Sequence, residues 1–311
     1  MRGNRFRPAR RRFLGWLGAL GAAAALPLPF PAQGRTAPIT RAIPSSGERL
    51  PVIGMGSWLT FDVGDDPQAL AQRAAVVRTF FARGGALIDS SPMYGSSEAT
   101  LGYCLRHVDN GRSLFAATKV WTAGRRPGLE QMERSRELWG VQRFDLMQVH
   151  NLVDWRTQLE SLRAMKADGR IRYLGVTTSH GRRHGLLEQL LDGETLDFVQ
   201  LTYNMADREA ERRLLPLAAE RGVAVIVNRP FQRGGLFERA RGRPVPGWAA
   251  EFDCANWAQF FLKFVVSHPA VTCAIPATSR VDHMRENMGA LYGRLPDADM
   301  RRRMLSYFQS L

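Results

Sequence analysis

The chain has 311 residues, of which 45% are hydrophobic, and its formal net charge is +14. A soluble chain of this length can bury a large core, either as two ordinary domains or as one α/β barrel. The three cysteines (104, 254 and 273) show no paired spacing, so we expect neither a disulfide framework nor a metal site. Most of the basic surplus is scattered rather than interleaved with aromatic residues, which argues against a nucleic-acid partner.

The N-terminal segment has the three-part layout of an export signal. Residues 2–12 are rich in arginine, residues 13–28 are apolar, and small residues follow. The run Arg10-Arg11-Arg12-Phe13-Leu14 resembles the consensus of twin-arginine export signals, although Ala9 stands where Ser or Thr is usual. Prolines interrupt the apolar run and make it a poor membrane span. We therefore expect residues 1–34 to be a twin-arginine signal peptide; a disordered basic tail and an uncleaved anchor are the alternatives.

A twin-arginine signal would make the export machinery a partner of this chain and the periplasm its destination. The mature protein would then be residues 35–311, with the signal either cleaved or retained as an anchor.

Residues 35–311 alternate strand-like and helix-like stretches. A hairpin is predicted over Ile39–Ile43 and Leu50–Ile53, ahead of a first interior strand from Ile53 to Ser57. Seven further strands are predicted at Ala86–Asp89, Leu114–Lys119, Asp145–His150, Tyr173–Thr177, Phe198–Thr202, Val223–Asn228 and Val271–Ala274. Helical patterns lie near 68–83, 97–107, 128–139, 155–168, 181–191, 207–220, 253–267 and 281–290. Eight strand–helix units without a GxGxxG motif favour an α/β fold, a (β/α)8 TIM barrel with an N-terminal β-hairpin, over a doubly wound sheet.

Polar residues stand where the predicted strands end. The active sites of barrels are built at the carboxyl ends of their strands, so side chains there are candidates for catalysis. Asp89, Lys119 and His150 end three successive strands, and Tyr94 follows in the loop after the first of them. Further polar residues near strand ends are Thr177, Thr178, Gln200 and Asn228. Taken singly, each has an ordinary structural explanation; four converging titratable groups favour a functional site.

These four residue types suit proton transfer to a carbonyl oxygen. Tyrosine has an ordinary pKa of about 10, so it needs a neighbouring cation to act near neutrality. We expect Lys119 to lower the pKa of Tyr94 and Asp89 to keep the buried lysine charged, while His150 orients the carbonyl. This set lacks a reductant, so a hydride-donating cofactor must complete it.

With these residues in place, the chain resembles the aldo-keto reductases, the NAD(P)H-dependent (β/α)8 oxidoreductases. The resemblance rests on Gly54-Met55-Gly56-Ser57, Asp89-(x4)-Tyr94-Gly95, Thr118-Lys119-Val120-Trp121, Asp145-Leu146-Met147-Gln148-Val149-His150 and Ile275-Pro276-(x9)-Glu286-Asn287. It implies Tyr94 as general acid, Lys119 and Asp89 as the pair that tunes it, and His150 as the residue that orients the carbonyl. It also implies that Trp121 walls the substrate pocket, to which Trp58 adds an apolar entrance.

The cofactor side departs from the family pattern. Thr177-Thr178 stands where Ser-Asn usually holds the nicotinamide carboxamide, and Asn228 replaces the tyrosine that stacks on the ring. The resemblance implies that Gln200 binds the same carboxamide. Its other implied cofactor contacts are Gly56, Ser57, Thr278, Glu286 and Asn287. Arg229, Arg233 or Arg280 could contact the phosphates, and we expect NADP(H) in preference to NAD(H), with no metal.

The sequence therefore predicts an NAD(P)H-dependent oxidoreductase acting on a carbonyl or alcohol. One alternative is a nicotinamide-binding sensor on the same barrel, and another is a Schiff-base lyase with Lys119 as nucleophile. Outside the cytoplasm the reduced cofactor is not freely regenerated, so we expect tightly held cofactor or an unidentified redox partner. Residues 231–250 are interpreted as either a loop over the cofactor or a surface insertion.

Overall fold

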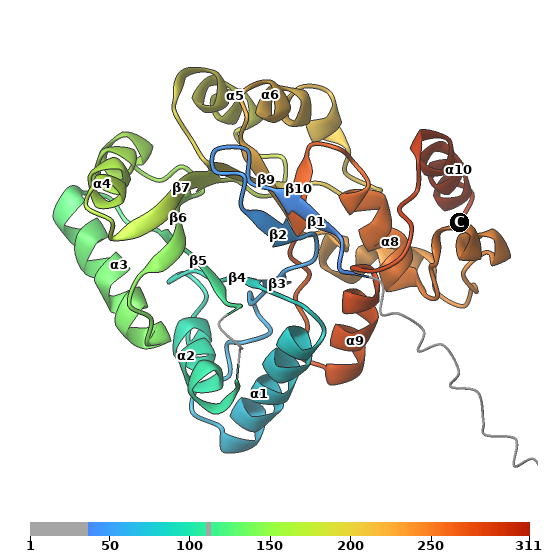
Figure 1. Cartoon of the computed structure of the whole chain (residues 1–311), viewed down its shortest axis with the longest axis horizontal. Helices are drawn as coiled ribbons and strands as arrows, with labels where there is room; N and C mark the ends of the chain where they lie inside the picture. The colour runs from blue at the N-terminus through green and yellow to red at the C-terminus, as the bar shows by residue number, and fades with distance from the viewer. Residues whose placement is uncertain (1–36, 110–112) are drawn as a thin grey trace, which may run out of the picture. The chain divides into compact units, whose positions relative to one another are not determined.

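The structure, a computed structural model, describes residues 37–109 and 113–311. The predicted signal peptide lies outside these described residues. Figure 1 looks down a barrel of parallel strands surrounded by helices. The strands are β3 (Met55–Gly56), β4 (Leu87–Asp89), β5 (Phe115–Val120), β6 (Phe144–His150), β7 (Ile171–Thr177), β8 (Phe198–Thr202), β9 (Ala224–Asn228) and β10 (Val271–Ala274). The predicted (β/α)8 TIM barrel is confirmed, with every interior strand within a few residues of its expected place.

The barrel closes between its first and last strands. The ladder runs in the order β10-β9-β8-β7-β6-β5-β4-β3, and parallel bridges join Ile53 to Ala274 and Gly56 to Ala277. Gly56 permits this approach, because a Cβ built there would lie 2.9 Å from the carbonyl oxygen of Ile275.

The barrel interior changes from apolar to polar along the strands. Successive side chains alternate between the two faces of a strand, so every second residue points inward. Along β5 these are Phe115, Ala117 and Lys119, and along β6 they are Leu146, Gln148 and His150. The apolar members form one interior cluster, and the polar members end at the carboxyl end of the barrel. The alternation therefore places the polar residues together before any loop contributes.

The predicted hairpin is also confirmed, as β1 (Thr40–Ala42) paired with β2 (Arg49–Pro51). Ile43 and Leu50 from this hairpin belong to the interior apolar cluster. In Figure 1 the hairpin lies across the centre of the barrel. Because its side chains pack against the apolar interior residues, the hairpin covers the end of the barrel opposite the polar residues.

The helices pack their apolar sides on the outer face of the sheet. They are α1 (Pro67–Ala82), α2 (Ser97–His107), α3 (Arg125–Trp139), α4 (Trp155–Ala167), α5 (His184–Gly193), α6 (Leu214–Glu220), α7 (Gly235–Arg239), α8 (Trp257–Val266), α9 (Val281–Gly289) and α10 (Ala298–Gln309). Several begin at side-chain caps: Asp66 accepts hydrogen bonds from the N–H groups of Gln68 and Ala69 at the start of α1. The helix expected over 207–220 is divided, because only a short 3-10 turn, Glu209–Glu211, precedes α6.

The segment 231–250 lies between β9 and α8 and contains short helical pieces. They are the 3-10 helix Gln232–Gly234, α7 and the start of a second 3-10 helix, Gly247–Phe252. Phe231 and Phe237 reach the cavity described next, whereas Trp248 packs on Phe260. The first part of the segment therefore borders the cavity, and its second part packs on α8.

Candidate active site

A cavity of about 440 Å³ opens at the carboxyl end of the barrel. Asp89, Tyr94 and His150 line it, as do Gly56, Ser57, Thr177, Gln200, Asn228 and Arg229 among the predicted cofactor contacts. Its volume falls in the range of small-molecule sites. The polar strand ends and the cavity therefore coincide.

Asp89 and Lys119 form a buried ion pair at the floor of this cavity. The Lys119 Nζ lies 2.5 Å from Asp89 Oδ2 and donates a second hydrogen bond to the carbonyl oxygen of Ser90, at 2.6 Å. Neither side chain exceeds 3% exposure. Burial opposes the charge of Lys119, but Asp89 and Tyr94 together outweigh that effect and raise the pKa of Lys119. The lysine is therefore a fixed cation where no water screens it.

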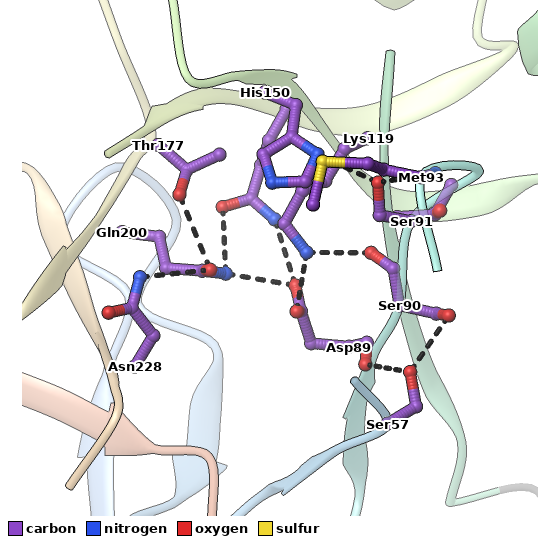
Figure 2. A network of polar contacts seen from close by, with 12 residues as sticks. Ser57, Asp89, Ser90, Ser91, Met93, Lys119, His150, Thr177, Gln200 and Asn228 are labelled. Atoms are coloured by element: carbon purple, nitrogen blue, oxygen red, sulfur yellow. Dashed lines mark hydrogen bonds and ion pairs between the residues drawn. The ribbon is translucent and has the colours of Figure 1, made fainter. Parts of the chain in front are cut away.

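Two glutamines complete the surroundings of Asp89, and Figure 2 labels one of them, Gln200. Gln148 Nε2 and Gln200 Nε2 donate to Asp89 Oδ1 at 3.1 and 2.9 Å. The carboxylate thus accepts hydrogen bonds on both oxygens. A buried charge is tolerated only when it is paired and hydrogen-bonded in this way.

Tyr94 lies beside the cation. The Lys119 Nζ is 5.1 Å from the centre of the Tyr94 ring, and the ring meets His150 edge to face at 5.6 Å between centroids. Burial raises the pKa of Tyr94 above its ordinary value, and Lys119 offsets only part of that rise. The expected fall in the pKa of Tyr94 is therefore wrong. The phenol is protonated at neutral pH, which is the form that can donate a proton.

His150 is a neutral hydrogen-bonding group. Burial, together with the nearby Lys119 charge, lowers its pKa to about 2. Its Nδ1 lies 2.8 Å from Ser91 Oγ, in the loop that follows Asp89. The tautomer in which Nδ1 accepts from Ser91 leaves Nε2–H free to donate. Ser91 is a partner that the sequence reasoning missed.

The predicted contacts for the carboxamide are largely bonded to one another. Gln200 Oε1 accepts from Thr177 Oγ1 at 3.3 Å and from Asn228 Nδ2 at 3.4 Å. Asn228 also donates to the carbonyl oxygen of Thr178 and accepts from Thr202. Thr178 Oγ1 is different, because it is buried without a hydrogen-bond partner. A buried hydroxyl without a partner is costly, so this atom is a natural contact for a bound polar group.

The loop after β9 carries two cations to the cavity. Arg229 and Arg233 both line it, each with positive φ (52° and 56°), and the Arg233 guanidinium stacks over Trp58 at 4.2 Å. Arg229 Nε is buried without a partner, and burial together with Arg233 lowers the pKa of Arg229. A bound anion would satisfy this donor and relieve the repulsion. The unpartnered atoms of Thr178 and Arg229 therefore fit a phosphate-bearing, amide-bearing cofactor.

Thr178 and the remaining predicted contacts lie outside the cavity lining. Thr278 Oγ1 accepts from the N–H of Arg280 just before α9, and Arg280 itself pairs with Asp282. Glu286 and Asn287 lie on α9, the first exposed and the second buried. The structure thus brings the residues predicted for catalysis together but does not gather the residues predicted for the adenosine end.

The two predicted pocket tryptophans differ in position. Trp58 lines the cavity, with its ring centroid 6.5 Å from that of Tyr94. Trp121 is 43% exposed and lies outside the cavity lining, and Gln131 binds its backbone. Phe231 and Phe237 are apolar cavity walls that sequence reasoning missed. Their only signal was their place in a loop after a strand end.

Comparison with known proteins identifies the family. Residues 52–303 match the sequence model of the Aldo/keto reductase family. The chain belongs to this family. An uncharacterized oxidoreductase of Schizosaccharomyces pombe is 28% identical over 157 residues, which cover 49% of this chain and 48% of that protein. The NADH-specific methylglyoxal reductase of Escherichia coli is 25% identical over 269 residues, covering 68% and 80% of the two chains.

A solved aldo/keto reductase from Klebsiella pneumoniae, in complex with NADP and acetate, has the same fold. Its TM-score is 0.69 at 22% identity, with 84% of this chain and 93% of that chain covered. As a member of this family, the present chain is an oxidoreductase.

Within the described residues no cluster of three His, Cys, Asp or Glu side chains could hold a metal ion. Across residues 37–109 and 113–311, no helix is long and apolar enough to cross a membrane.

Proposed function

We propose that this aldo/keto reductase transfers hydride between a nicotinamide cofactor and a small carbonyl or alcohol. The observation that carries the proposal is Tyr94, protonated and placed between the Lys119 cation and His150 at the cavity wall. When bound, the cofactor supplies or accepts the hydride. The protein's own residues supply the proton and orient the oxygen.

In the reducing direction, the Tyr94 hydroxyl donates its proton to the oxygen as negative charge develops there. The fixed Lys119 cation stabilises the phenolate that remains, because its charge is fully buried and lies close to the Tyr94 ring. Asp89 keeps Lys119 in place and balances its charge. In the oxidising direction the same phenolate accepts the proton from the alcohol.

His150 orients the reacting oxygen without changing its own protonation. With a pKa of about 2 the imidazole is neutral across the physiological range. Its Nε2–H donates a hydrogen bond to the oxygen that Tyr94 protonates. The apolar side chains of Trp58, Phe231 and Phe237 line the cavity around this point.

We infer that Thr178, Arg229 and Arg233 help to hold the cofactor, and that NADP(H) is preferred to NAD(H). A relative solved with NADP supports this choice, whereas the methylglyoxal reductase is NADH-specific by name. We further propose that the protein is exported by the twin-arginine machinery, with its cofactor tightly held or reduced by an unidentified redox partner.

The test is a fluorescence titration with NADPH and NADH, followed by a panel of aldehydes and ketones. We expect tighter binding of NADPH and turnover of at least one carbonyl. Tyr94→Phe should bind NADPH as the wild type does but lose about two to four orders of magnitude in kcat, which is the range for a general acid.

Binding without turnover of any carbonyl would instead favour the sensor alternative. The observation that favours a sensor is Asn228, which stands where the family has a stacking aromatic and donates a hydrogen bond to Thr178. Absence of binding by either nucleotide would contradict the proposal altogether. Borohydride trapping of a carbonyl on Lys119 would indicate a Schiff-base enzyme; the ion pair with Asp89 argues against this, because it keeps the amine protonated.

A further inference from the structure

Asp89 is held from two sides by different donors. Lys119 donates to Oδ2, while both glutamine amides, Gln148 and Gln200, converge on Oδ1. All four side chains are nearly inaccessible to water. A carboxylate bonded through one oxygen alone could rotate, whereas bonding at both oxygens fixes its plane.

We propose that Gln148 and Gln200 are positioning residues, which clamp Asp89 so that its Oδ2 faces Lys119. The clamp acts on catalysis only through Lys119 and Tyr94, and for that consequence it rests on the proposed function. Gln148 is absent from the cavity lining, so it lies where no substrate or cofactor reaches it. Its role must therefore pass through Asp89 and Gln200.

Gln200 has no hydrogen-bonding capacity left for a cofactor. Its Nε2 donates to Asp89 Oδ1 and to Gln148 Oε1, the latter at 3.3 Å. Its Oε1 accepts from Thr177 and Asn228. An amide has two N–H donors and two acceptor lone pairs, so all four positions are used. Turning the amide over would place Oε1 against the carboxylate, which fixes the orientation.

The clamp gives Gln200 a different role from the one that the family resemblance implies, which is a contact with the nicotinamide carboxamide. The two roles are separable by experiment. A cofactor contact, when removed, weakens cofactor binding and leaves Lys119 unchanged. A clamp, when removed, changes Lys119 and leaves cofactor binding unchanged.

The small number of lysines in the chain allows the side-chain NMR signal of Lys119 to be observed directly. It contains only three lysines, Lys119, Lys166 and Lys263. Lys166 pairs with Asp197 at the surface, whereas Lys263 is held by four backbone carbonyls, those of residues 252, 253, 292 and 294. Protein labelled with ¹⁵N-lysine should therefore give at most three side-chain signals, with Lys263 as a buried internal standard. Lys119→Arg assigns the remaining buried signal.

The experiment compares the Nζ spectrum, kcat and NADPH affinity of the full-length wild type with those of Gln148→Met and Gln200→Met. Both variants should shift or broaden the Lys119 signal while the Lys263 signal stays in place. Both should lower kcat about tenfold, the equivalent of one hydrogen bond to a charged group, with NADPH affinity unchanged. The matched control is Gln158→Met, a fully buried glutamine that donates to the backbone carbonyls of Thr122 and Gly124; it should leave the Lys119 signal unchanged.

An unchanged Lys119 signal in both variants would overturn the clamp, as would a Gln200→Met protein that only loses NADPH affinity. Should either methionine variant not fold, Gln148→Glu serves instead. It places a second carboxylate against Asp89, so the Lys119 signal should become pH-dependent. If the wild type turned over no carbonyl, the spectra would still report the clamp, so the two proposals fail independently.

Discussion

At the scale of single residues, the charge of Lys119 influences the pKa values of both Tyr94 and His150. Its charge is stabilised by Asp89, and it acts on Tyr94 and His150 in different ways. It lowers the energy of a Tyr94 phenolate, and it disfavours protonation of the His150 imidazole. In the mechanism proposed above, one buried cation therefore acts on both the proton donor and the orienting group.

The protonation of His150 predicts a pH dependence of stability. The native imidazole has a pKa of about 2, against an ordinary value of 6.5, so below pH 6.5 the unfolded chain binds a proton that the native state does not. This contribution to stability is complete above pH 6.5 and is lost as the pH falls. His150→Gln cannot titrate, so its free energy of unfolding, measured in urea between pH 7 and 4, should fall less steeply than that of the wild type. The difference approaches about 1.4 kcal/mol per pH unit; parallel slopes would contradict the assignment.

The guanidinium of Arg233 predicts a salt-dependent contribution to cofactor binding. Arg233→Met keeps an apolar contact with Trp58 but removes the charge from the cavity, so we expect about a tenfold increase in the Kd for NADPH, diminishing at high salt. The control is Arg239→Met, which removes an arginine stacked on Phe308 and should leave the Kd unchanged. Equal effects of the two substitutions would show that the result is not specific to the cavity.

At the scale of elements, strand ends were easier to predict than helices. Asp89, Lys119 and His150 follow short apolar runs, and the period of two fixes which face each occupies. The same period could have identified Gln148, two residues before His150. Helix α10 was not predicted, because only Met304 and Phe308 of its polar sequence are buried. Contacts between elements distant in sequence, such as Ser91 with His150 or Arg233 with Trp58, leave no local pattern.

The packing of α2 on α3 gives a prediction at this scale. A Cβ at Gly102 would lie 1.9 Å from the carbonyl oxygen of Leu138, which is backbone and cannot move aside alone. Gly102→Ala should therefore destabilise the protein by about 1–3 kcal/mol, despite the better helix propensity of alanine. Gly185→Ala, in α5 with no atom within 4 Å of the added Cβ, should be neutral or stabilise by about 0.5–1 kcal/mol. Thermal unfolding checks both, and equal effects would contradict the close approach.

At the scale of the whole molecule, a closed barrel is joined in sequence to an arginine-rich, signal-like segment. The barrel could be predicted because eight strand–helix units repeat, whereas the cofactor side could not be placed fully. Thr278, Glu286 and Asn287 resemble family contacts by spacing, but neither the segment before α9 nor α9 itself carries them to the cavity lining. Loop conformation decides that geometry, and the sequence pattern contains no information on it.

The signal-like segment gives a prediction for the cell. Under the export proposal, Arg10 and Arg11 are the twin-arginine pair, so replacing both with lysine should retain the protein in the cytoplasm. Cell fractionation measures this, with Arg5→Lys/Arg7→Lys as the matched control that keeps the pair. Unchanged periplasmic yield in the Arg10/Arg11 variant, or equal loss in the control, would contradict twin-arginine export.

The central claim is that Tyr94 donates the proton in a hydride transfer. The most direct measurement is a single turnover of NADPH-loaded protein mixed with an excess of a reactive aldehyde in stopped flow, for the wild type and Tyr94→Phe. We predict that the wild type oxidises one equivalent of bound NADPH, and that Tyr94→Phe does so about a hundredfold or more slowly. Equal rates in the two proteins would contradict the role of Tyr94, and failure of the wild type to oxidise NADPH with any carbonyl would contradict the reductase itself.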